Sequence, residues 1–494
     1  MSARTTRRSA LQAAGALLAA AGWPVAAGAA TPGIETPPEP GPPRPLKLPP
    51  VEQVRLANGL RVVVAPRSRV PLVTASLMVM AGGENEPAGR AGLAAATVGL
   101  LVKGARRGGR AVGATALAQQ AEALGASVDS GSGWRSASLG MTVTTPRLPQ
   151  ALALLADLLR QPLLQAEEWA RARDQTLDEL RLTLASPGSV AAMAARRVFW
   201  GRGPWAASAT PASLQRIGID DLRALHRSAY RPERSVLLLA GDIDAAAALR
   251  LAERLFGGWQ ASGAALAPVE PLAPASALQR LVLVDMPGSG QSGVVLAAPF
   301  AALGDAERRV AEVASAVLGG GYSSRLNQEV RIKRGLSYGV SVAGEMQPGG
   351  GLWTAQAQTQ HATAAQVAEL LRSEVLRLAQ EPPAAAELAA RQATLVGRFA
   401  RRLETGAGMA AVLGSLLAQG RPLADLGGYV DEVQAVTPAQ VQAFAQRHWR
   451  ADALRVVVAG DLSGESGAAL RALDAGALVR PLSGIDFERA DLGG

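Results

Sequence analysis

The chain of 494 residues offers few side chains that could hold a catalytic metal. It contains no cysteine and three histidines, His226, His361 and His448, and no two of these lie within one helical turn. A zinc ion would have to rest mostly on carboxylates, which suit harder cations better. The lack of cysteine also excludes disulfides, thiolate metal sites and a cysteine nucleophile. We therefore expect neither a metal nor another cofactor in this chain.

A second group of residues lies around a glycine run at 319–321. Serines that can cap a helix follow the run, and the helix should end at Gly335. A strand is expected over 336–342. Arg331 would then lie near the helix end and Tyr338 at the start of the strand, and the glycine turn would fold one toward the other. The run is not a phosphate-binding loop, because no Gly-Lys-Ser/Thr follows it.

The N-terminus has the pattern of an export signal. Arg4 and the pair Arg7-Arg8 precede an Ala/Leu-rich stretch, and a run of small residues at 27–29 matches an A-x-A cleavage pattern. The arginine pair favours the twin-arginine route, with a Sec signal as the alternative. We expect a signal peptide over 1–30, a Pro-rich tether over 31–50 and a periplasmic protein.

Composition excludes two classes of partner. The net charge is +9, but no Lys/Arg run is interleaved with aromatic residues, so nucleic-acid binding is not expected. No later stretch approaches the roughly 20 apolar residues that span a bilayer, so no membrane span is expected either.

The sequence contains an internal repeat. Residues 217–242 align without a gap to 436–461, at an offset of 219 residues, and each copy is an amphipathic helix followed by an apolar strand and Gly-Asp. An Ala/Pro-rich linker over 260–277 separates the copies. We predict an N-terminal domain over 51–259, a C-terminal domain over 278–480 and a tail over 481–494.

Strands in each half come in pairs and are followed by grouped helices, which favours α+β layers over a parallel sheet. The expected strands are 60–65, 72–80, 236–240, 281–285, 292–297 and 456–459, and the expected helices include 148–160, 166–183 and 364–379.

Five motifs occur in an order that resembles the pitrilysin/insulinase zinc metallopeptidases, in their two-domain, paired-subunit branch. They are Leu56 to Val62, Glu86 to Ala94, Lys103-Gly104, Tyr230-Arg231-Pro232 and the two Gly-Asp pairs. The resemblance covers about residues 51–480. It implies two homologous domains, each a mostly antiparallel sheet with helices packed on one face, together forming half of a clamshell.

Members of this family carry an HxxEH motif directly after the Gly-Leu-Ala that ends the second motif. Its histidines bind zinc and its glutamate activates a water molecule. Here the corresponding positions are Ala95, Val98 and Gly99, none of which can bind a metal or move a proton. Glu179 matches the third zinc ligand, but without the histidines we expect it to be a solvated helix acid. The resemblance therefore implies a non-catalytic subunit.

Arg331 and Tyr338 match an Arg/Tyr pair with which family members grip substrate opposite the zinc. The resemblance implies that Arg331 holds peptide carbonyls and that Tyr338 donates to the scissile carbonyl. The alternative is that Arg331 makes a surface ion pair and Tyr338 fills the sheet face. Arg325 and Arg334 are competing candidates, but neither keeps the seven-residue step to Tyr338.

The glycine run resembles a loop that non-catalytic subunits of mitochondrial processing peptidases present to substrate. An ordinary turn between helices is the other interpretation. Its residues are Gly319, Gly320 and Gly321.

The resemblance thus predicts a protein that is inactive alone and contributes to metalloendopeptidase activity through an HxxEH-bearing homologous subunit that carries the zinc. The pair would be a heterodimer or a dimer of heterodimers acting on unfolded peptides. The alternative is a scaffold protein, as related core subunits of respiratory complexes are. A third hypothesis, an independent zinc protease with unfamiliar ligands, is disfavoured by the histidine count.

Overall fold

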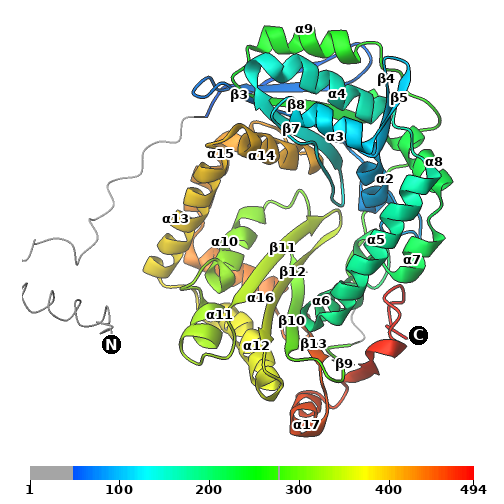
Figure 1. Cartoon of the computed structure of the whole chain (residues 1–494). Coiled ribbons are helices and arrows are strands. Elements are labelled where there is room, and N and C mark those ends of the chain that lie inside the picture. The colour runs from blue at the N-terminus through cyan, green and yellow to red at the C-terminus, as the bar shows by residue number, and fades with distance from the viewer. Residues whose placement is uncertain (1–47, 276–278, 494) are drawn as a thin grey trace, which may run out of the picture. The chain divides into compact units, whose positions relative to one another are not determined.

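The computed structural model describes residues 48–275 and 279–493 (Figure 1). The predicted signal peptide and nearly all of the Pro-rich tether lie outside the described residues. Across these two ranges, no helix has both the length and the apolar character that crossing a membrane requires.

Two six-stranded sheets lie at the centre of the described chain, one in each half. The strand order is β1-β2-β8-β3-β7-β6 in the first and β11-β12-β10-β13-β9-β14 in the second. Most pairings are antiparallel, but β2 pairs with β8, and β9 with β13 and β14, in parallel. The α+β class is therefore confirmed, with mixed sheets. The strands are β1 Glu52–Arg55, β2 Arg61–Pro66, β3 Leu72–Val79, β6 Asp129–Ser132, β7 Ala137–Thr144, β8 Ser235–Gly241, β9 Leu281–Asp285, β10 Ser292–Phe300, β11 Val340–Gln347, β12 Gly350–Thr359, β13 Arg455–Gly460 and β14 Leu478–Pro481, besides a hairpin of β4 Gly104–Arg107 and β5 Arg110–Gly113.

The internal repeat extends through the helices. Four helices of the first half have counterparts that begin 219 residues later, in the same order. The pairs are α5 Ala166–Ala185 with α13 Ala385–Arg402, α6 Pro187–Trp200 with α14 Gly406–Ala418, α8 Ile219–Ala229 with α16 Pro438–His448, and α9 Ala245–Phe256 with α17 Gly464–Ala472. The remaining helices are α2 Leu93–Leu101, α3 Ala114–Glu122, α4 Leu148–Arg160, α7 Pro211–Arg216, α10 Arg308–Gly319, α11 Arg325–Asn327, α12 Ala364–Gln380 and α15 Asp425–Gln434.

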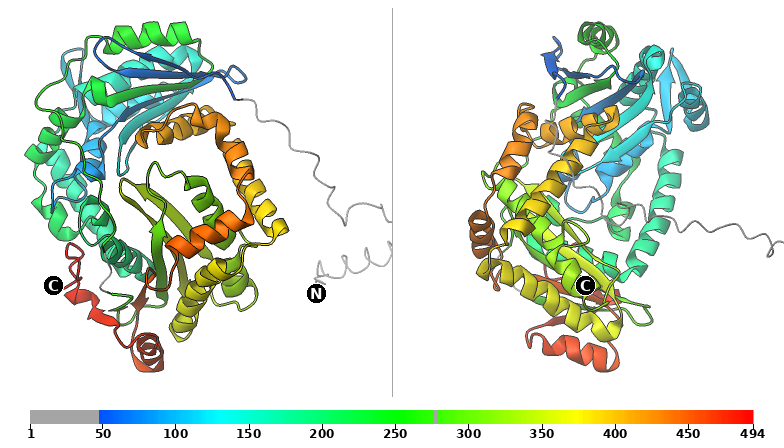
Figure 2. Two further views of the ribbon diagram at one scale, coloured as in Figure 1. Left: turned by 180° about the vertical axis from the view of Figure 1, so that it is seen from behind. Right: turned by 90° about the vertical axis from the view of Figure 1, so that its left-hand side faces the viewer.

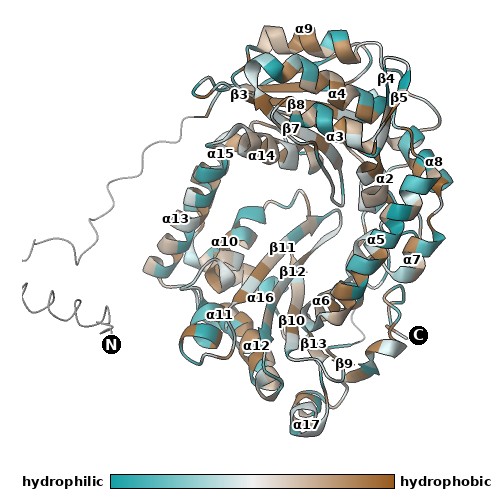
Figure 3. Cartoon of the chain, in the orientation of Figure 1, coloured by the Kyte–Doolittle hydropathy of each residue, from teal (hydrophilic) through white to brown (hydrophobic). Residues whose placement is uncertain are grey.

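Strands β2 and β8 of the first sheet and β10 and β13 of the second are buried on both faces, which explains why they are almost continuously hydrophobic (Figure 3). In β2, Val62 and Val64 enter the core formed with the helices of their own half, whereas Val63 and Ala65 point to the other face. Alternate residues of a strand must point to opposite faces, so a run without polar positions needs cover on both sides.

That second cover comes from the opposite half. Helix α6 packs on β10 and β13 of the second sheet, and its repeat counterpart α14 packs on β3 and β8 of the first (Figures 1 and 2). Each half's own helices lie on one face, as expected, but the other face is not left open. The predicted boundary at 260–277 separates the two sheets, while each half contributes one helix to the sheet of the other.

Glycine allows these exchanged helices to approach their strands. A side chain at Gly293 in β10 would come within 2.5 Å of the backbone of Gly188 in α6. In the other half, a side chain at Gly406 in α14 would come within 2.7 Å of the carbonyl oxygen of Ala240 in β8. Small residues at both contacts are therefore required by the close packing of helix on strand.

Candidate functional site

Helix α2 keeps a well-formed start although its sequence has lost the metal motif. The carboxylate of Glu86 accepts hydrogen bonds from the backbone N–H groups of Gly92 and Ala94, at 3.1 and 2.7 Å. These are N–H groups that the helix itself cannot satisfy. Burial raises the pKa of Glu86 to about 7.

The positions that correspond to the metal motif offer no ligand atoms. Ala95 is exposed, a side chain at Gly99 would meet no atom within 4 Å, and Val98 is buried in the core. Glu179 lies exposed on the neighbouring helix α5, where its carboxylate accepts a hydrogen bond from Gln175. The space beside α2 is therefore open, but its residues do not fit a zinc ion.

The three histidines have other partners. His226 hydrogen-bonds a backbone carbonyl of α4, His361 hydrogen-bonds the hydroxyl of Ser292, and His448 lies 3.7 Å from the carboxylate of Glu307. In the part of the chain that the structure describes, no three His, Cys, Asp or Glu side chains are grouped so that they could hold a metal ion.

The structure brings Arg331 and Tyr338 together, as the sequence predicts. The guanidinium carbon of Arg331 lies 4.6 Å from the ring centre of Tyr338 and 4.8 Å from that of Tyr322. All three side chains line a cavity of about 790 Å³. Tyr338 is 90% exposed, so it does not fill a sheet face.

The local fold that carries Arg331 differs from the expected α-helix. Helix α11 ends after one turn and continues as a π-helical segment, Gln328–Ile332, which holds Arg331. Such wide turns are frequent at functional sites. The π-helical segment ends at Ile332, earlier than expected, and a turn over 333–334 leads to Gly335, whose φ of +62° lies in the left-handed region that favours glycine. The next strand begins at Val340 rather than at residue 336.

Asn327 joins the parts of this site. Its side-chain amide lies within hydrogen-bond distance of the carbonyl oxygens of Gly321 and Val340 and of the Ser324 hydroxyl, at 3.1–3.2 Å. Its side-chain oxygen accepts a hydrogen bond from the N–H of Val340 at 2.9 Å. The glycine run, the helix start and the start of β11 are therefore held together through one buried side chain.

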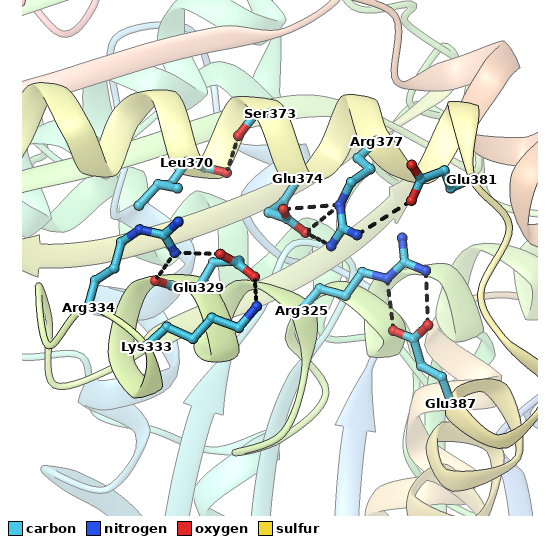
Figure 4. Close-up of polar contacts among 10 residues, drawn as sticks. All are labelled: Arg325, Glu329, Lys333, Arg334, Leu370, Ser373, Glu374, Arg377, Glu381 and Glu387. Atoms are coloured by element: carbon cyan, nitrogen blue, oxygen red, sulfur yellow. Dashed lines mark hydrogen bonds and ion pairs between the residues drawn. The ribbon is translucent and has the colours of Figure 1, made fainter.

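The competing arginines are occupied by carboxylates. Arg325 makes two hydrogen bonds to Glu387, at 2.8 and 2.9 Å, and Arg334 pairs with Glu329 (Figure 4). The guanidinium of Arg331 makes no hydrogen bond or ion pair with any residue in 48–275 or 279–493, whereas its backbone carbonyl accepts a hydrogen bond from the N–H of Gly335. The geometry of a surface ion pair is therefore not observed for Arg331, and its donors remain available.

Two family models match the chain. One, described as Insulinase (Peptidase family M16), covers residues 61–201, and the other, described as Peptidase M16 inactive domain, covers residues 216–395. The chain belongs to the M16 (insulinase) peptidase family. This M16 chain is 27% identical to an uncharacterized zinc protease of Streptomyces coelicolor over 80% of its own length and 86% of that protein. It is 22% identical to a non-peptidase homolog of Helicobacter pylori over 78% of its length and 88% of that protein.

A solved structure shares the same architecture. The crystal structure of a peptidase M16 inactive domain from Pseudomonas fluorescens matches with a TM-score of 0.76 and 26% identity, over 83% of this chain and 98% of that one. The two-domain fold expected from the resemblance is thus shared with a member of the family.

The glycine run of this M16 chain is packed rather than free. A side chain at Gly319 would overlap Val342 of β11, at 2.2 Å. Arg398 of α13 donates to the carbonyl oxygen of Gly320 at 2.6 Å, and Arg391 donates to the Ser323 hydroxyl at 2.7 Å. The run is therefore held against β11 and α13, and its role in presenting substrate stays a prediction.

Sequence reasoning missed two residues of this site, Tyr322 and Asn327. Tyr322 directly follows the glycine run and is 63% exposed, although it is aromatic. An aromatic residue at such a turn is a signal that could have been noticed. Asn327 carries no comparable signal, because a polar residue inside a predicted helix is normally solvated.

Proposed function

We propose that this M16 protein is the non-catalytic, substrate-binding subunit of a heteromeric zinc metallopeptidase. An HxxEH-bearing homologous subunit supplies the zinc, and Arg331 and Tyr338 act in trans on an unfolded peptide bound between the two. The observation that carries the proposal is the unpaired Arg331 beside an exposed Tyr338 in an open cavity.

Arg331 and Tyr338 do little to stabilise the fold. An arginine that makes no ion pair and an almost fully exposed tyrosine contribute little to stability, whereas the neighbouring Arg325 and Arg334 are both paired with carboxylates. Aligned donors of this kind are what stabilise the charge that develops on a carbonyl oxygen in peptide hydrolysis. A scaffold protein would have no need of them.

The location of the Arg331 cavity in the described chain also favours action in trans. The residues that line the cavity of Arg331 come from α6, β10 and the preceding Gln291, β11, β12 and the segment 322–339, and none comes from α2. Arg331 and Tyr338 therefore do not share a cavity with α2, the helix whose positions correspond to the metal motif. A reacting bond held by Arg331 would need a metal from another polypeptide.

The test is reconstitution. The full chain is mixed with an HxxEH-bearing homologue from the same genome, and hydrolysis of a quenched fluorescent peptide is followed. Arg331→Ala and Tyr338→Phe should each reduce the rate by about 10- to 1,000-fold, the range for losing one aligned donor. Arg334→Ala removes a charge three residues away, outside the cavity, and should leave the rate nearly unchanged.

Full activity in both Arg331→Ala and Tyr338→Phe would refute the role of the pair. A reconstituted complex that assembles but never gains activity over its parts would instead favour the scaffold alternative.

A further inference from the structure

The cavity around Arg331 carries positive charge and no negative charge among its described lining residues. Among the residues that the structure describes, Arg331 is the only charged side chain that lines it, and none of these lining residues carries a carboxylate. The other polar side chains are neutral amides and hydroxyls, which can donate as well as accept: Ser189, Gln291, Asn327, Ser337, Ser341, Gln356, Gln358 and the two tyrosines. An anionic ligand would meet one unneutralised cation there and no opposing charge.

Tyr322 helps to restrict the movement of the Arg331 guanidinium, which is a hydrogen-bond donor. With Tyr338 it provides two aromatic rings over which the guanidinium lies, at 4.8 and 4.6 Å. Arginine stacked on aromatic rings keeps the N–H groups at its edge, and their fork matches the two oxygens of a carboxylate. Because two rings limit the movement of the side chain, less conformational entropy is lost when a ligand binds.

The fixed surroundings of Tyr322 explain its position. The preceding glycine run is held by Arg398, and Asn327 binds the carbonyl oxygen of Gly321. The first turn of α6 also lines the cavity, with Gly188 and Ser189, and the start of a helix favours negative charge. The unneutralised guanidinium and the helix start thus favour the same ligand chemistry.

We infer that Tyr322, Arg331 and Tyr338 form a carboxylate-binding subsite, so that this subunit prefers peptides presenting a carboxylate to Arg331. Tyr322 is a specificity-determining residue of the site. The carboxylate comes either from the C-terminus of a short peptide or from an Asp or Glu side chain. The inference rests on the proposed substrate-binding function and adds the class of substrate.

The experiment measures binding to the full chain alone, by fluorescence anisotropy of labelled, unfolded ten-residue peptides. One pair of peptides differs only in a C-terminal acid or amide, and a second, amidated pair differs only in one internal Asp or Asn. Removing the recognised carboxylate should weaken binding by about 10- to 100-fold, as expected for charge-assisted hydrogen bonds. The pair that shows the loss identifies the source of the carboxylate.

Variants assign the effect to the subsite. Arg331→Lys keeps the charge but not the fork and should reduce the discrimination to about threefold or less. Tyr322→Ala should weaken binding of the carboxylate peptide by about 3- to 10-fold, whereas Tyr322→Phe, which keeps the ring, should bind as the wild type does. Arg334→Ala is the matched control for loss of a nearby charge and should discriminate like the wild type.

Equal affinity for all four peptides in the wild-type chain would overturn the carboxylate preference but leave the proposed peptide-binding function intact. Failure of every peptide to bind, together with full activity of Arg331→Ala in the reconstituted pair, would overturn both.

Discussion

Asn327→Ala should loosen the site without unfolding the protein. The Asn327 side chain is 7% exposed and joins the glycine run to the first residue of β11. Its loss leaves the N–H and carbonyl groups of Val340 without this partner, while the carbonyl of Gly321 still accepts from the N–H of Ser324. Val340 is 5% exposed, so water cannot readily replace the lost bonds.

The magnitude follows from the unsatisfied groups. A buried donor or acceptor left without a partner costs about 1–3 kcal/mol, and the carbonyls tolerate the loss better than the N–H. We therefore expect the free energy of local opening around Val340 to fall by about 2–4 kcal/mol, which corresponds to exchange about 30- to 1,000-fold faster at its amide.

Hydrogen exchange measured by mass spectrometry on a peptide spanning 336–347 reports this opening directly. The control is Gln446→Ala, which removes one exposed amide hydrogen bond to the carbonyl of Ala379 and should change stability by less than about 0.5 kcal/mol. Unchanged exchange around Val340, or acceleration no greater than in the control, would refute the role assigned to Asn327.

Further predictions concern helix α2, Glu86 and export. Ala95→His combined with Gly99→His places two imidazoles one turn apart on α2, which contacts the helix α5 that carries Glu179, and should create zinc binding, detectable by isothermal titration calorimetry in the full chain. Burial raises the pKa of Glu86 to about 7, so the folded state holds this proton more tightly than the unfolded chain. Its contribution to stability is complete below about pH 4.5 and falls by up to about 3 kcal/mol as the pH rises through 7. The thermal midpoint of the wild type should therefore fall relative to that of Glu86→Gln as the pH rises from 5 to 8, and parallel curves would contradict this. Replacing Arg7 and Arg8 by lysine should block export if the twin-arginine route is used, and fractionation of the host cell measures it.

The sequence predicted the elements well because their signals are local. Helix α4 and strand β9 have the predicted bounds, and the repeat places α8 and α16 at the predicted offset. Hydrophobic periodicity and the Gly-Asp pairs at strand ends do not depend on distant contacts, so these elements could be predicted directly from the sequence.

The exchange of α6 and α14 could not be predicted in the same way. Both helices carry small and hydrophobic residues, and this composition does not indicate which of the two sheets each helix packs against. The π-helical form around Arg331 likewise depends on tertiary contacts made by Asn327. The pairing of Arg331 with Tyr338 was predicted because the glycine at 335 fixes a local turn, whereas Tyr322 joins through packing of the glycine run.

The central claim is tested most directly by zinc content and peptide hydrolysis of the purified full chain, measured alone and after mixing with its HxxEH-bearing homologue. We expect no stoichiometric zinc and no hydrolysis from the chain alone, and hydrolysis that depends on Arg331 from the pair. Chelator-sensitive hydrolysis by the isolated, homogeneous chain would contradict the account.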